Sequence, residues 1–283
     1  MRYTTLKYFF LLATLIGPIF SAPAHALESA LELREIYSST VDRKLNPPAE
    51  EQRYYAELLL YHLQKAGLSK LPAQYMLLVD RSPNVQAIFL FWLGADGQAE
   101  LIGASPASTG KENGYEYFET PTGIFEHNPR NMDFRAEGTK NEHGLRGYGD
   151  KGMRIYDFGW VKARKSWVDE IGDMRLQLHS TDLLKLEQKL GVALSKGCIR
   201  IPASLNKLLD HYGILDADYE LAANNNKVRK ILDPSREATA WPGKYLIIID
   251  SRRVQRPDWS PLPALKKTPV TIPKPEQKTA DTF

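Results

Sequence analysis

The segment Ser195-Lys196-Gly197-Cys198-Ile199-Arg200-Ile201 contains the only cysteine of the 283-residue chain. His179 lies nineteen positions before this cysteine, at the end of a strand-like run, Arg175-Leu176-Gln177-Leu178. A cysteine attacks as its thiolate, so it needs a neighbour that lowers its pKa or removes its proton, and at neutral pH that neighbour is usually a histidine. Gly197 allows a tight turn that leaves amide hydrogens free to face a developing oxyanion. Together these residues predict acyl transfer through a thioester.

The first residues of the chain predict export. Arg2 and Lys7 form a short basic region. The apolar stretch that follows, residues 8–20, is shorter than a typical membrane-spanning helix. Ala24-His25-Ala26 is an A-x-A cleavage site. We therefore expect residues 1–26 to be a signal peptide and the mature protein to be soluble, outside the cytoplasm and without a stable membrane span; an uncleaved N-terminal anchor is the alternative.

An exported protein normally pairs its cysteines or lacks them, so the unpaired thiol of Cys198 indicates a need for its reactivity. The net charge of the whole chain is +3, and loss of Arg2 and Lys7 with the signal peptide lowers it to about +1. No stripe of Lys and Arg interleaved with aromatic residues occurs. The sequence therefore argues against nucleic acid as a partner.

The rest of the chain divides into three zones. Residues 27–73 predict a small helical N-terminal segment, in which Pro47-Pro48 precedes a helix that Gly67 ends. Residues 74–250 change to a strand pattern, with helical spacing confined to residues 183–190 and 203–212. Residues 251–283 are rich in proline and lysine, which predicts a flexible, extended cationic tail. The expected strands are residues 75–80, 87–92, 99–104, 123–127, 153–158, 174–179 and 245–250, and they indicate a mainly β domain with few helices.

These residues resemble the catalytic domain of the L,D-transpeptidase family, also called the YkuD-like domain. The family pattern is a histidine in an H-G-T-like segment, a gap of about fifteen residues, and S/T-H-G-C followed by I/V-R and an apolar residue. Here it stands as His179-Ser180-Thr181, the gap, and residues 195–201. A second segment, Thr120-Pro121-Thr122-Gly123-Ile124-Phe125, is similar to the family's T-P-x-G-x-F, and Ser108-Thr109-Gly110 precedes it in the place of S-T-G.

The resemblance covers roughly residues 74–250, and two positions depart from it. Ser180 replaces the common glycine after the histidine, which affects the pocket behind the imidazole. Lys196 replaces a histidine two residues before the cysteine, which bears on substrate preference more than on catalysis. The resemblance implies a YkuD-like β-sandwich with short helices.

The resemblance also implies a periplasmic or cell-wall location and peptidoglycan stem peptides as substrate. In this family the cysteine attacks the carbonyl at the L-centre of the third stem residue and expels the fourth, D-alanine. An amine from another stem peptide, or from a lipoprotein lysine, then resolves the thioester in cell-wall remodelling. No metal ion and no organic cofactor are implied. Water as the acceptor makes the enzyme an L,D-carboxypeptidase instead, and the sequence leaves this alternative open.

The expected roles of the site residues follow from their positions. Cys198 is the nucleophile, His179 is the base, and Ser195 matches the family's hydroxyl position and orders the site. Gly197 and Cys198 provide oxyanion amides. Arg200, two residues past the nucleophile, lies on the same side of an extended segment and is expected to hold a substrate carboxylate by a forked pair, with a structural salt bridge as the alternative.

Three other side chains are weaker candidates. His143 lies in residues 138–152, whose glycines indicate a mobile lid, and we expect it to contact substrate. Asp182 is either a third member of the catalytic group or a helix cap. His127 is expected to be a solvated loop histidine.

Two other classes of peptidase fit the sequence poorly. Neither H-x-H nor H-E-x-x-H occurs, so a zinc peptidase lacks its ligand pattern. A papain-type peptidase places its cysteine early and its histidine late, the reverse of the order here. A catalytically silent wall-binding module remains the non-enzymatic alternative, although such a module requires neither Cys198 nor His179.

Overall fold

The computed structural model describes residues 30–263 and shows a mixed α/β fold with more strand than helix. Within these residues the strands form two sheets, in the orders β3-β2-β1-β9-β4 and β5-β6-β7-β8. The strands are β1 (Gln74–Asp80), β2 (Ala87–Leu93), β3 (Ala99–Pro106), β4 (Gly123–Glu126), β5 (Phe134–Arg135), β6 (Arg154–Arg164), β7 (Ile171–His179), β8 (Ile199–Arg200) and β9 (Tyr245–Ile249). The helices are α1 (Ala30–Thr40), α2 (Ala49–Lys65), α3 (Ala203–His211), α4 (Ala217–Leu221) and α5 (Asn226–Ile231), with a 3₁₀ turn at Glu187–Lys189. The expectation of strands with few helices is thereby confirmed.

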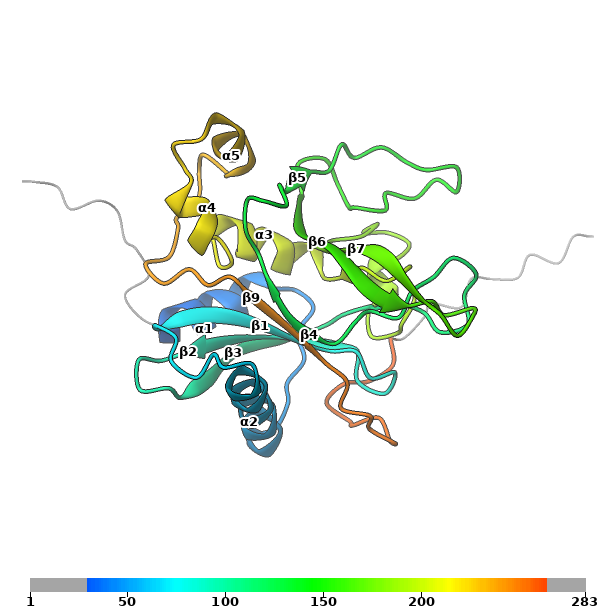
Figure 1. The fold of residues 1–283 in the computed structure, drawn as a ribbon, viewed down its shortest axis with the longest axis horizontal. Helices are drawn as coiled ribbons and strands as arrows, with labels where there is room; N and C mark the ends of the chain where they lie inside the picture. The colour runs from blue at the N-terminus through cyan, green and yellow to red at the C-terminus, as the bar shows by residue number, and fades with distance from the viewer. Residues whose placement is uncertain (1–29, 264–283) are drawn as a thin grey trace, which may run out of the picture.

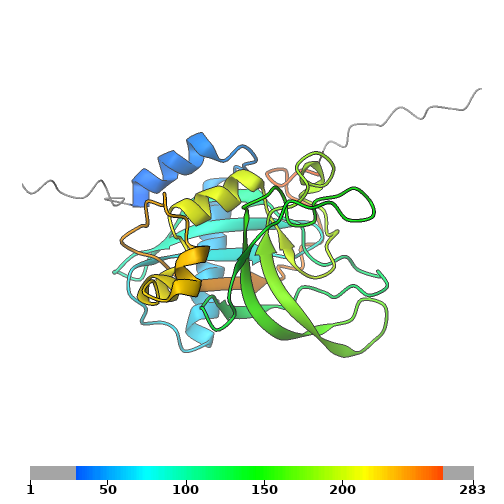
Figure 2. The same ribbon diagram turned by 90° about the horizontal axis from the view of Figure 1, so that it is seen from above.

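The five-stranded sheet is buried on both faces. All seven residues of β1 are buried, and their side chains alternate between two hydrophobic clusters, as the two-residue period of a strand requires. Leu77 contributes to the cluster shared with the second sheet, α1 and α3, whereas Leu78 faces α2. Figure 1 shows α2 below this sheet and the β6–β7 hairpin with α3 on the other side, and in Figure 2 the strands of that hairpin cross those of the larger sheet.

The two N-terminal helices belong to the same hydrophobic core as the sheets. Helix α2 begins after Pro48 and ends just before Gly67, whose φ of +75° terminates the helix, as the sequence predicts. Tyr55 of α2 stacks on Phe89 of β2 with ring centroids 4.2 Å apart. Leu33 of α1 is buried in the cluster between the two sheets. The two helices of the predicted helical segment therefore pack on opposite faces of the five-stranded sheet and are part of the domain.

Residues 251–263 differ from the flexible tail that the sequence predicts. The Ser260 hydroxyl is buried and donates to the Val85 carbonyl at 2.6 Å. The Trp259 ring lies against Tyr55 and Phe89, with centroids 5.8 and 5.9 Å away. The sequence does not predict this packing, because the segment forms no helix or strand and is fixed by side-chain contacts instead. The signal peptide and the tail from residue 264 lie outside the described residues.

The helix expected at residues 183–190 is only a 3₁₀ turn in the structure. Asp182 accepts hydrogen bonds from the Leu184 and Lys185 amides, as a helix cap does. Gly191, whose φ is +103°, ends the helical backbone conformation soon afterwards. So short a segment has too few turns to offset the cost of helix nucleation.

None of the helices in the described part of the chain has the length and apolar character needed to cross a membrane.

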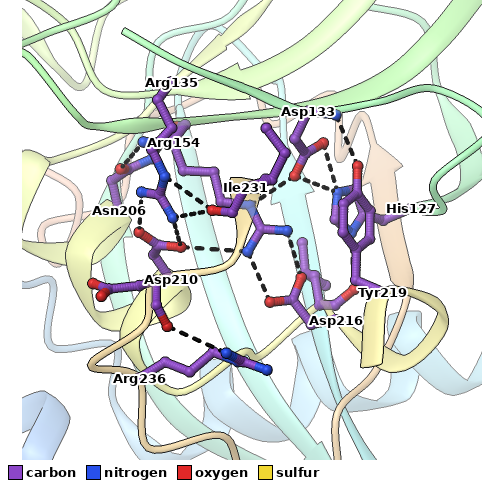
Figure 3. A network of polar contacts seen from close by, with 12 residues as sticks. His127, Asp133, Arg135, Arg154, Asn206, Asp210, Asp216, Tyr219, Ile231 and Arg236 are labelled. Atoms are coloured by element: carbon purple, nitrogen blue, oxygen red, sulfur yellow. Dashed lines mark hydrogen bonds and ion pairs between the residues drawn. The ribbon is translucent and has the colours of Figure 1, made fainter. Parts of the chain in front are cut away.

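A buried ionic network ties β5, β6, α3 and α4 together (Figure 3). Arg154 of β6 is fully buried, and its two terminal nitrogens each lie 2.7 Å from Asp216, while its Nε lies 2.7 Å from Asp133. Asp210 accepts from both Arg154 and Arg135. Such a planar, forked arrangement satisfies the arginine's donors and the carboxylates together.

His127 lies inside this network, which corrects the expectation of a solvated histidine. Its Nδ1 donates to the Leu215 carbonyl at 2.8 Å and its Nε2 lies 2.9 Å from the Asp133 carboxylate. Both partners only accept, so both ring nitrogens carry hydrogen and the ring is an imidazolium. Burial opposes this charge, but Asp133 more than offsets it and raises the pKa of His127. The network thus balances three cations, Arg154, Arg135 and His127, against three aspartates.

Candidate active site

The pairing of β7 with β8 brings the predicted cysteine and histidine to one face of the smaller sheet. The two strands are parallel, with Leu178 beside Ile199 and His179 beside Arg200. Leu178 and Ile199 are fully buried in the core. Because side chains alternate along a strand, His179, Arg200 and Cys198 project from the opposite face. Cys198 is therefore a diagonal neighbour of His179.

His179 is held as a neutral base. Its ring is buried, and Nδ1 lies 2.5 Å from the Ser180 carbonyl. A carbonyl only accepts, so Nδ1 carries the hydrogen and Nε2 keeps its lone pair. Burial lowers the pKa of His179 to about 4, the Ser180 carbonyl opposes this in part, and the Arg200 guanidinium lowers it further. The imidazole is thus ready to accept a proton throughout the neutral range.

The Cys198 thiol is half-buried beside β7. Its Sγ lies 3.6 Å from the Arg175 carbonyl and 4.0 Å from Gln177 Oε1. Burial raises the pKa of Cys198, against the lowering influence of the Gln177 backbone and the Arg200 charge. The resting pair is therefore a neutral thiol and a neutral imidazole, and this arrangement favours proton removal during attack over a preformed thiolate.

The turn before Cys198 is fixed by Ser195. Its hydroxyl donates to the Cys198 carbonyl at 2.5 Å and accepts from the Gly197 amide at 3.0 Å. Gly197 has φ +129°, a conformation that side-chain-bearing residues rarely adopt. No acceptor for the Cys198 amide is seen within residues 30–263. Of the two expected oxyanion donors, the Gly197 amide is thus already engaged, and the Cys198 amide remains available.

The second motif of the sequence packs directly against this turn. The Thr120 hydroxyl donates to the Gly197 carbonyl at 2.7 Å and accepts from the Gly110 amide at 2.9 Å. Ser108 exchanges two backbone hydrogen bonds with Arg200. A Cβ on Gly110 would lie 1.9 Å from the Phe118 carbonyl oxygen, so only glycine fits there. Segments that are 70 or more residues from Cys198 in sequence therefore shape the turn that carries it.

Arg200 lies beside His179 on the same face as the cysteine. Its Nη1 donates to the Leu194 carbonyl at 3.3 Å, and no carboxylate of the described residues lies within ion-pair distance of its guanidinium. Burial lowers the pKa of Arg200, although Cys198 and Tyr117 act in the opposite direction. The Lys196 ammonium lies 5.5 Å from the Tyr117 ring centroid. Arg200 thus offers a forked donor to an anion that residues 30–263 do not supply.

Three side chains that sequence reasoning missed support the thiol. Asp157 of β6 is buried and accepts from Gln177 Nε2 at 2.9 Å. Since a carboxylate only accepts, this contact turns Gln177 Oε1 towards the Tyr148 hydroxyl, 3.1 Å away, and towards Cys198. The Tyr148 ring meets His179 edge-on with centroids 4.7 Å apart. The only sequence signal was the position of Gln177 two residues before His179 on one strand.

Among the described residues, neither His143 nor Asp182 makes a hydrogen bond or ion pair with the side chains of Cys198 or His179. His143 is exposed in the loop, and its nearest charged partner is Glu142 at 3.4 Å. Asp182 accepts from the Arg146 amide at 3.0 Å besides capping the turn after it, so it fastens the 138–152 loop to the end of β7. The loop reaches the site through Tyr148, whose ring meets His179, and contact of His143 with substrate stays a prediction.

Comparison of the chain with models of known protein families gives no match, and a search of curated proteins finds no significant relative. Within residues 30–263, no three His, Cys, Asp or Glu side chains group as metal ligands do. What the site does is therefore inferred from its geometry and from the two motifs.

Proposed function

We propose that this protein is an L,D-transpeptidase of the YkuD-like kind, a periplasmic or wall-associated cysteine acyltransferase that acts on peptidoglycan stem peptides. The observation that carries the proposal is the parallel β7–β8 register. It sets Cys198 diagonally beside His179 on one sheet face, with Nε2 of the imidazole unprotonated because Nδ1 donates to Ser180. A nucleophile with an adjacent, oriented base is the arrangement that acyl transfer requires.

The first half-reaction forms a thioester. The Cys198 sulfur attacks the carbonyl at the L-centre of the third stem residue while Nε2 of His179 takes the thiol proton. The new oxyanion accepts a hydrogen bond from the Cys198 amide. Collapse of this intermediate breaks the C–N bond, and His179 returns the proton to the departing D-alanine amine.

The second half-reaction resolves the thioester with an amine. The acceptor nitrogen attacks the carbonyl and gives its proton to His179, the C–S bond breaks, and the sulfur regains a proton. Arg200, which lacks a carboxylate partner among the described residues, supports binding of a substrate carboxylate beside the cysteine. The acceptor is an amine of a second stem peptide or of a lipoprotein lysine.

Water in place of the amine would make the protein an L,D-carboxypeptidase with the same first step. Mass spectrometry of muropeptides after incubation with tetrapeptide sacculi separates these outcomes, because cross-linked dimers, trimmed tripeptides and released lipoprotein differ in mass. We expect cross-linked products, none in the Cys198→Ala variant, and no effect of EDTA. Loss of activity on chelation with recovery on adding zinc would overturn the proposal, and no product from the folded wild type would favour the wall-binding alternative.

A further inference from the structure

A second concave site lies at the end of the β6–β7 hairpin, where the hairpin meets residues 112–119. Its volume is about 540 Å³, and Tyr115 and Trp167 stand in its lining. Their ring centroids are 5.9 Å apart and the planes are tilted by 58°, so neither ring stacks on the other. Tyr115 is 75 % exposed, which leaves a large aromatic surface open to a ligand.

Four of the five charged residues that line this cavity are in ion pairs, and among the described residues only Glu112 of that lining has none. Arg164 lies 3.1 Å from Asp169 and 3.7 Å from Glu119, and Lys165 lies 2.7 Å from Glu170. An anionic ligand would have to compete with these pairs for Arg164 and Lys165, whereas a neutral polar ligand would not. Aromatic surfaces with polar side chains around them suit a molecule that has apolar faces and hydrogen-bonding edges. A sugar ring has this character.

The cavity adjoins the cysteine turn through one residue. Phe118 meets Trp167 edge-on with centroids 5.6 Å apart, and its amide donates to the Lys196 carbonyl at 3.2 Å. The Phe118 side chain also lies against Gly197, where an added Cβ would be 3.2 Å away. Phe118 thus packs between Trp167, where a ligand would bind, and Gly197, which precedes Cys198.

We propose that Tyr115 and Trp167 form a binding subsite for an N-acetylated sugar of the glycan strand, beside the thiol that processes the attached peptide. This inference rests on the proposed function for its biological substrate, but sugar binding itself is measured without catalysis. The subsite would let the enzyme hold the polymer while the stem peptide reaches Cys198.

The test is a titration of the full-length protein with the β-1,4-linked tetramer of N-acetylglucosamine, followed by tryptophan fluorescence and calorimetry. We expect saturable binding that weakens at least tenfold in Trp167→Ala and in Tyr115→Ala. The matched controls are Trp160→Ala, an exposed tryptophan on β6 outside the cavity, and Tyr61→Ala, an exposed tyrosine on α2. Both controls should bind like the wild type.

Absence of binding, or a loss confined to Trp160→Ala, would overturn the subsite. A second measurement compares KM for a stem peptide with and without its disaccharide: Trp167→Ala should raise KM only for the sugar-bearing form. If the wild type turns over neither form, the proposed function fails, whereas the titration still decides the subsite.

Discussion

At the scale of the residue, the protonation state of His179 decides how the thiol is activated. The pKa of His179 is lowered to about 4, while burial raises the pKa of Cys198. At neutral pH neither group is charged, so under the proposed mechanism the proton moves from sulfur to nitrogen during the attack. If the proposed function holds, a base that is neutral down to about pH 4 also allows activity in mildly acidic surroundings.

The pH profile of acylation tests this assignment. In the wild type we expect a rate that is nearly constant between pH 6 and 8 and falls as His179 becomes protonated, near pH 4. His179→Ala should lose roughly 10²–10⁴-fold at pH 7, the usual contribution of a general base. Its rate should rise with pH towards the raised pKa of the thiol, because alkali then supplies the thiolate. Recovery stays incomplete, since protonation of the leaving amine is still missing in turnover.

His143→Ala is the control for this measurement, because the His143 side chain is exposed and its ion-pair partner among the described residues is Glu142. The rates are followed with an ultraviolet-detected β-lactam. Identical pH profiles in His179→Ala and the wild type, or a loss of activity that appears in His143→Ala instead, would remove His179 from the role of base.

At the scale of the element, the turn that presents the nucleophile depends on a backbone conformation that only glycine adopts readily. We expect Gly197→Ala, at φ +129°, to lower the free energy of unfolding by about 1–3 kcal/mol and to slow acylation, because the Cys198 amide and thiol shift together. Gly147→Ala is the control, since an added Cβ there has no atom within 4 Å. Denaturant unfolding and acylation rates check both; a fully active Gly197→Ala would show that the turn is not strained.

The buried network is the element that fixes β6, and with it Asp157, behind the site. Arg154→Met would leave Asp216 buried without its cation and Asp133 with His127 alone, so we expect a loss of about 3–5 kcal/mol in the free energy of unfolding. Lys162→Met is the matched control on the same strand: its pair with Asp173 is exposed and should contribute at most about 1 kcal/mol. Equal losses in the two variants, measured by urea unfolding, would mean that the network does not hold the strand.

At the scale of the whole molecule, sequence patterns predicted the long strands but not the short strand that follows Cys198. The long apolar runs of β1, β2 and β9 were found because a strand buried on both faces needs them. β8 is only two residues long and carries no pattern of its own, yet it sets the cysteine beside β7. The position of Cys198 therefore followed from a motif and not from a predicted strand.

Supporting side chains could not be predicted because their contacts are long-range. Gln177, Tyr148 and Asp157 come from three separate elements, and only the fold brings their polar atoms together. His127 looked like a loop histidine because nothing near it in sequence indicates Arg154 and its aspartates. The packing of residues 251–263 was missed for the same reason, since Trp259 meets partners on α2 and β2.

The central claim is that Cys198 forms a covalent acyl-enzyme, and intact-protein mass spectrometry after incubation with a carbapenem tests it most directly. A β-lactam carbonyl presents an acyl group to the same sulfur, so we predict one adduct on the wild type, mapped to Cys198 by digestion. Cys198→Ala, whose unfolding midpoint should match the wild type, is predicted to gain no mass. An adduct on Cys198→Ala, or a wild type that remains unmodified while it still processes tetrapeptide sacculi, would contradict the account.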